Sequence, residues 1–81
     1  MLEDSASDNL IVGLRRSVKT IESGEAEKAY VAEDIAPGLY EDFTALCEQF
    51  NVPCQRVQSK AALGKACHID VGASVAVVRK D

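Results

Sequence analysis

The sequence predicts an α/β fold: a three-layer α/β/α sandwich with a four-stranded mixed sheet. Two observations carry this prediction. Short apolar runs alternate regularly with segments of helical periodicity, and glycine, proline or acidic residues stand at most of the boundaries. A length of 81 residues fits one domain, and 47% hydrophobic residues are enough for a modest core. Strict alternation of strands and helices predicts helices on both faces of the sheet.

The first half of the chain supplies two strands and one helix. The apolar run Leu10–Val12 before Gly13 predicts a short strand. The inner face of the following helix, at spacings of four and three, is predicted to be Leu14, Val18 and Ile21. Ser23 and Gly24 end this helix, since glycine suits a left-handed cap. Residues 28–32 predict a strand packed on both faces.

The second half continues the alternation. Pro37 suits the first turn of a second helix, whose predicted buried stripe is Leu39, Phe43, Leu46 and Phe50, widened by Tyr40 and Cys47. Residues 54–57 predict a short strand. Ser59 is expected to cap a third helix, with inner positions Leu63, Ala66 and Cys67. Residues 73–78 are apolar enough to form a central strand.

Charge is distributed unevenly behind the net value of −4. Residues 10–21 and residues 55–69 each hold three basic side chains and no acid, whereas residues 22–48 hold eight acids and one lysine. The negative net charge therefore does not mean that the surface is uniformly acidic. The two basic segments are compatible with a polyanionic partner.

The first helix opens with an unusual group of charges. Arg15 and Arg16 lie at its start, and Lys19 shares their face at spacings of four and three. Cations are unfavourable at a helix N-terminus, where free N–H groups already carry partial positive charge. An anion such as phosphate would relieve this conflict. The alternative interpretation, an ordinary solvated helix face, also fits these residues.

The loop after the third helix is the second distinctive feature. Lys65 precedes it, and Ile69 and Val71 flank Asp70 within it. Apolar side chains in an exposed loop could cover an unstacked nucleobase. Alternatively, Ile69 and Val71 face the core.

Together these features resemble the ribosomal L-seven-Ae/L-thirty-e family of kink-turn RNA-binding proteins, over about residues 9–78. The most specific match is Leu63-Gly64-Lys65-Ala66 followed by residues 69–76, Ile-Asp-Val-Gly-Ala-Ser-Val-Ala. The chain is most similar to short bacterial members. The resemblance implies an α/β/α sandwich that binds sharply bent RNA containing G·A pairs. It places Gly13, Arg15, Arg16 and Lys19 in the groove at these pairs, Ile69, Asp70 and Val71 against the projecting bases, and Lys65 near phosphate.

The chain departs from the family pattern at the start of the first helix. Leu14-Arg15-Arg16 stands where archaeal and eukaryotic members resemble Thr-Asn-Glu and bacterial members resemble Thr-Lys-Gln. The arginines keep donors for guanine N7 and O6 but lack the acceptor that Glu or Gln offers to guanine amino groups. This departure bears on selectivity for G·A pairs and not on RNA binding itself. Because the overall positive charge is low, we expect RNA binding of modest affinity and strong salt dependence.

Other chemistry is not indicated. Cys47, Cys54 and Cys67 form no Cys-x-x-Cys pair, and His68 completes no zinc motif, so we expect structural thiols, no metal and no cofactor. Cys67 and His68 are adjacent and point apart on a helix, so no enzyme activity is expected. No membrane span is expected, and the acidic residues 1–8, predicted to be loosely ordered, are unlike a targeting segment, which indicates a cytoplasmic protein.

A second interpretation remains open. A protein-interaction domain could use the same fold after losing RNA binding, with the acidic side at Glu41, Asp42 and Glu48 as its surface. In either case, nothing in the sequence demands a dimer, and we expect a monomer.

Overall fold

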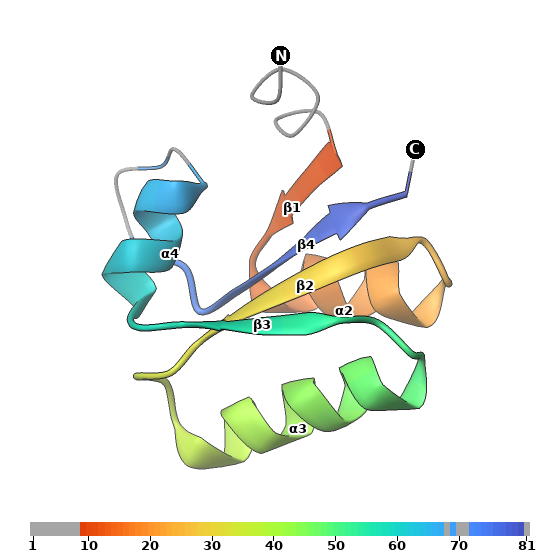
Figure 1. Ribbon diagram of the computed structural model, residues 1–81, viewed down its shortest axis with the longest axis horizontal. Helices are drawn as coiled ribbons and strands as arrows, with labels where there is room; N and C mark the ends of the chain where they lie inside the picture. The colour runs from red at the N-terminus through yellow and green to blue at the C-terminus, as the bar shows by residue number, and fades with distance from the viewer. Residues whose placement is uncertain (1–8, 68, 70–71, 81) are drawn as a thin grey trace.

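A computed structural model describes residues 9–67, 69 and 72–80. Along the chain the elements are β1 (Leu10–Val12), α2 (Leu14–Glu22), β2 (Ala26–Ala32), α3 (Pro37–Gln49), β3 (Cys54–Val57), α4 (Lys60–Ala66) and β4 (Val75–Arg79) (Figure 1). The predicted alternation of strands and helices is confirmed. The acidic segment 1–8 lies outside the described residues.

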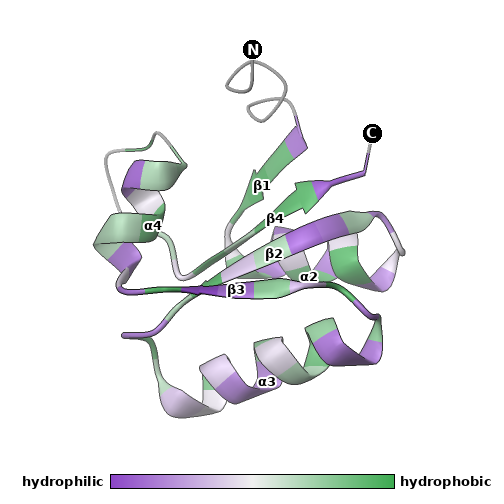
Figure 2. Ribbon diagram, viewed as in Figure 1, coloured by the Kyte–Doolittle hydropathy of each residue, from purple (hydrophilic) through white to green (hydrophobic). Residues whose placement is uncertain are grey.

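The four strands form one mixed sheet in the order β1-β4-β2-β3. β4 is antiparallel to both of its neighbours, whereas β2 and β3 run parallel. The prediction of a mixed sheet with residues 73–78 in a central strand is confirmed, although that strand begins at Val75 and ends at Arg79. Figure 2 shows β4 hydrophobic along most of its length, as expected for a strand that is covered on both faces.

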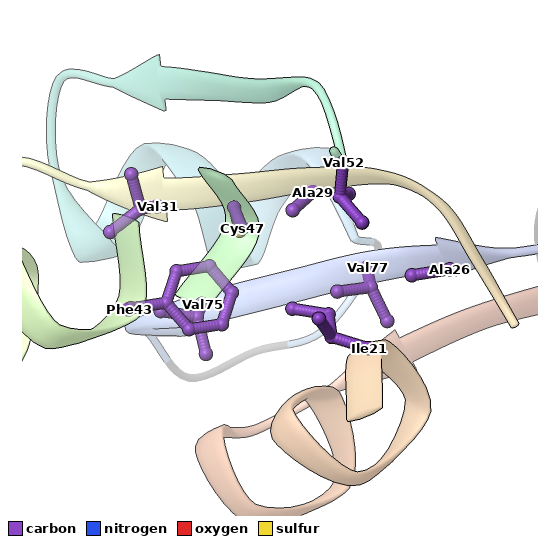
Figure 3. Close-up of a cluster of buried hydrophobic side chains, with 9 residues drawn as sticks. All are labelled: Ile21, Ala26, Ala29, Val31, Phe43, Cys47, Val52, Val75 and Val77. Carbon is purple, nitrogen blue, oxygen red and sulfur yellow. The ribbon is translucent and has the colours of Figure 1, made fainter. Parts of the chain in front are cut away.

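Two clusters of buried side chains lie on opposite faces of the sheet, because neighbouring residues of a strand point to opposite sides. On β2, Val31 belongs to the cluster under α2 and α3, whereas Ala32 belongs to the cluster under α4. Figure 3 shows the first cluster, in which Ile21 of α2 and Phe43 and Cys47 of α3 meet side chains of β2 and β4. The three-layer α/β/α prediction is therefore confirmed.

The buried face of α3 is rotated from the predicted one. Phe43 and Cys47 are buried and Tyr40 packs beside them, whereas Phe50 is 37% exposed and Leu39 only half-buried. The helix ends at Gln49, so Phe50 falls at its cap and no longer lies on the buried face of the helix. The prediction that Phe50 is buried is wrong for this reason.

Similar corrections apply to the other two helices. Leu14 is 37% exposed because α2 buries Ser17 and Ile21 instead. Ser17 was not predicted as a core residue; it is fully buried, and its hydroxyl donates to the carbonyl oxygen of Ile11 at 3.5 Å. On α4, Leu63 and Gly64 are buried while Ala66 is exposed.

The start of α4 is capped by two side chains. Ser59 Oγ accepts a hydrogen bond from the backbone N–H of Ala62 at 3.0 Å, which confirms the predicted N-cap. Asp34 Oδ1 accepts from the backbone N–H of Lys60 at 2.8 Å. Both donors at this helix end are thus satisfied within the domain.

Candidate nucleic-acid interface

The start of α2 differs from that of α4 because no side chain caps it. Gly13 is the N-cap residue, with φ 107° and ψ 150°, and no acidic residue lies in the first turn. The first helical hydrogen bond runs from the N–H of Ser17 to the carbonyl oxygen of Gly13 at 3.0 Å. The N–H groups of residues 14–16 precede this bond and point out of the helix end. This end therefore offers backbone donors to an external acceptor.

Two exposed basic side chains, Arg15 and Arg16, lie in the first turn of α2, and a third, Lys19, lies in its last turn. Across the described part of the chain the only ion pair joins Arg56 Nε to Glu33 Oε2, at 3.9 Å. None of the three α2 bases is therefore neutralised by a described carboxylate. Arg16 and Lys19 also line a hollow with Glu25 and with Arg79, which ends β4 and lies at the opposite end of that strand from Val75.

The loop that leads into β4 reaches the same edge of the molecule. The backbone N–H of Gly13 donates to the carbonyl oxygen of Val75 at 3.1 Å, so the start of α2 lies against the start of β4 (Figure 1). The same loop end is held on its other sides. The carbonyl oxygen of Ser74 accepts a hydrogen bond from the N–H of Ala32 at 2.9 Å. The N–H of Ala73 donates to the carbonyl oxygen of Lys60 at 3.0 Å. The basic helix end and the end of this loop are thus neighbours.

Of the predicted loop residues, Ile69 is the one that the structure describes. Its side chain is half-buried against the cluster under α4, and its N–H donates to the carbonyl oxygen of Gly64 at 3.0 Å. Ile69 therefore packs partly onto the domain, as the core-facing alternative anticipated. Lys65 is exposed in the last turn of α4. Asp70 and Val71 lie outside the described residues.

Leu14 also lies at this edge, and it is exposed although the sequence predicted it on the buried face of the helix. It stands between Gly13 and Arg15, and it is one of two large hydrophobic side chains, with Phe50, that are exposed among the described residues. The sequence pattern was ambiguous here, because the four-residue spacing between Leu14 and Val18 also fits two residues on the buried face of α2. An exposed leucine beside basic groups adds an apolar contact to the polar ones.

The rest of the described chain holds no group of three or more histidine, cysteine or acidic side chains that could bind a metal ion. No helix among the described residues is long and apolar enough to cross a membrane. The three cysteines are free thiols, with Cys47 and Cys67 buried and Cys54 half-buried.

These features define a small α/β/α-sandwich domain that carries a basic, uncapped helix end beside a loop. The chain belongs to the ribosomal protein L7Ae/L30e/S12e/Gadd45 family, whose model matches residues 2–81.

Its relatives include the RNA-binding protein YbxF of Geobacillus stearothermophilus, which is 39% identical over 71 residues, covering 86% of this chain and 87% of YbxF. An RNA-binding protein of Bacillus pumilus is 32% identical over 74 residues, covering 91% of this chain and 90% of that protein. Among solved structures, the Giardia lamblia 15.5kD RNA binding protein superimposes with a TM-score of 0.85 at 30% identity, covering 99% of this chain and 68% of that one.

Proposed function

We propose that this chain is a single RNA-binding domain that recognises kink-turn RNA with the start of α2 and the loop after α4. One observation supports the proposal: the hydrogen bond from Gly13 to Val75 holds the start of α2 against the first residue of β4, where the loop after α4 ends. A sharply bent RNA presents a widened groove and projecting bases close together. In the proposal, the two elements contact these two parts of one ligand.

In this proposal the start of α2 contacts the groove at the G·A pairs. The open N–H groups and the positive helix end favour a phosphate oxygen. Arg15 and Arg16 each offer planar donors that match guanine N7 and O6. Lys19 on α2 and Lys65 on α4 supply further positive charge for the backbone. Gly13 has no side chain to obstruct the approach, and the space beside it is open.

The loop after α4 is proposed to cover the bases that project from the bend. Ile69, Asp70 and Val71 are the residues assigned to this contact. Leu14 extends it with an exposed apolar surface at the start of α2. Stacked or apolar cover of an unpaired base is a common way to recognise distorted RNA.

The relatives support this proposal because YbxF and the Giardia lamblia protein are both named as RNA-binding proteins. The net charge of −4 indicates that binding depends on the local basic edge rather than on the whole surface. We propose a monomeric, cytoplasmic, non-catalytic protein that acts in a ribonucleoprotein, with ribosomal RNA as one candidate ligand.

The test is a gel-shift titration with three RNAs: a kink-turn, the same RNA with its G·A pairs replaced by Watson–Crick pairs, and a plain duplex of equal length. The proposal expects the kink-turn to bind at least tenfold more tightly than either control. Equal binding of all three RNAs would indicate a general RNA-binding protein and would overturn the kink-turn part of the proposal. No binding of any would favour the protein-interaction alternative, with the exposed residues Glu41, Asp42 and Glu48 as its surface.

A matched variant separates local contacts from total charge. Lys28 is an exposed base on β2, in register with Val78 and thus at the opposite end of the sheet from Gly13. Lys28→Ala should leave kink-turn affinity within about twofold, whereas Arg16→Ala removes the same charge at the proposed contact and should weaken binding about tenfold or more.

A further inference from the structure

A tight turn after the C-terminal end of α3 brings Cys47 and Cys54 close together. After α3 ends, Asn51 adopts a positive φ of 57°, and the N–H of Val52 donates to the carbonyl oxygen of Cys47 at 2.8 Å. The chain then enters β3, where Cys54 is the first residue and lies in register with Ala29 of β2. The two cysteines therefore stand at either end of one short turn.

Their side chains share one environment. Cys54 packs against the cluster of which Cys47 is a member, between α3 and the sheet. Both also line a single surface hollow, together with Thr44, Glu48 and Arg56. A small molecule that enters this hollow from solvent would therefore meet both residues.

The two thiols differ in exposure and in acidity. Cys47 is 1% exposed, whereas Cys54 is half-buried and therefore the accessible one. The neighbouring thiol of Cys47 lowers the pKa of Cys54, against the opposing effect of its burial. The same contact, together with burial, raises the pKa of Cys47. Cys54 is thus the better thiolate and Cys47 the thiol that supports it.

We propose that Cys47 and Cys54 are a redox-active thiol pair that closes to an intramolecular disulfide when a peroxide enters their shared hollow. The Cys54 thiolate attacks one oxygen of hydrogen peroxide, the O–O bond breaks, and Cys54 becomes a sulfenic acid while hydroxide leaves and takes up a proton. The Cys47 sulfur then attacks the Cys54 sulfur and loses its proton, the S–O bond breaks, and water leaves. Two thiols are oxidised and one peroxide is reduced to two waters.

The third cysteine provides an internal control. Cys67 is 8% exposed and belongs to the cluster under α4, on the opposite face of the sheet from Cys47. Burial raises the pKa of its thiol. Cys67 should therefore react with peroxide more slowly than Cys54 and should not join the disulfide.

Peptide mapping of the oxidised chain tests the proposal. Trypsin cuts after Lys28 and Arg56, so Cys47 and Cys54 fall on one peptide, residues 29–56, without Cys67. After hydrogen peroxide treatment this peptide should lose the mass of two hydrogen atoms. Cleavage after Glu48 places Cys47 and Cys54 on separate fragments. The proposed disulfide should hold these two fragments together until a reductant is added.

Variants identify the role of each sulfur. Cys67→Ala should still form the cross-link, and Cys54→Ser should not. Cys47→Ala should stop the reaction at a sulfenic acid on Cys54, which dimedone traps. A peptide 29–56 that keeps both thiols while Cys67 oxidises, or a cross-link through Cys67 or between chains, would overturn the proposal. The mapping of the unmodified chain decides the question even where a variant fails to fold.

Discussion

Gly72 lies directly against Lys60: a β-carbon added at position 72 would stand 3.1 Å from Cβ of Lys60 and 3.4 Å from its carbonyl carbon. The next residue, Ala73, donates its N–H to the carbonyl oxygen of Lys60 at 3.0 Å. Lys60 itself is held by its hydrogen bond to Asp34. The loop end is therefore fitted closely against a fixed helix start.

Gly72→Ala should consequently displace the loop rather than the helix. We expect a loss of about 1 kcal/mol in the free energy of unfolding, since overpacking of this kind costs about 1–3 kcal/mol and the lost flexibility of glycine offsets part of it. RNA affinity should fall as well. Urea denaturation and the kink-turn titration measure the two effects.

Gly38 is the matched control for this substitution. It lies in the first turn of α3, and a β-carbon there would meet nothing within 4 Å. Gly38→Ala should raise the free energy of unfolding by about 0.5 kcal/mol and leave RNA binding unchanged. If both alanine variants have the same stability, the close fit at Gly72 has no energetic consequence.

Replacing Arg15 and Arg16 together with alanine should weaken kink-turn binding by about thirtyfold or more, since each base-contacting arginine contributes roughly 1–3 kcal/mol. The slope of log affinity against log salt should become shallower by about 2 if both side chains also neutralise phosphate. Stability should stay the same or rise by a few tenths of a kcal/mol, because the repulsion at an uncapped helix start is relieved. Unchanged RNA affinity would show that α2 is not the contact.

Leu14→Ser tests the apolar part of the proposed interface. Because Leu14 is 37% exposed, its removal should cost less than about 1 kcal/mol of stability, well below the cost of emptying a buried site. The variant should lose several-fold in affinity for the kink-turn while its salt dependence stays the same. Phe50→Ser, at the other exposed hydrophobic residue, should leave RNA affinity intact. Thermal unfolding and gel shifts in a salt series distinguish these outcomes.

Stability at alkaline pH should depend on Cys67. Burial raises the pKa of this thiol above its ordinary value of 9.0, so the folded chain holds the proton more tightly than the unfolded chain. The stabilisation is fully present below the ordinary pKa and is lost as pH rises through that value toward the higher folded pKa. Between about pH 8 and pH 10, the free energy of unfolding should therefore fall more steeply for the parent than for Cys67→Ala. Parallel curves would contradict this account.

Local patterns in the sequence were sufficient to predict most elements. The strand Cys54–Val57 and the Ser59 cap occur at the residues where the sequence predicted them. Helix orientation was less certain, because four-residue spacing allows two neighbouring faces. For this reason Leu14 and Phe50 were placed in the core although both are exposed.

The arrangement of the candidate site depended on information that the sequence does not display. Strand order decides which ends meet, and no local signal specifies that β4 lies between β1 and β2. The basic residues of α2 were identifiable from their position at a helix start. The proximity of this helix start to the start of β4 emerged only from the hydrogen bond between Gly13 and Val75.

The central position of β4 also has a consequence for biosynthesis. β1 has no partner in the sheet other than β4, and the contact between Gly13 and Val75 spans most of the chain. A nascent polypeptide that has emerged from the ribosome only as far as α4 lacks the strand that completes the proposed RNA-contacting edge. If the proposed function holds, capture of a cognate RNA therefore requires that β4 has been made and has inserted between β1 and β2, which precede it in the chain.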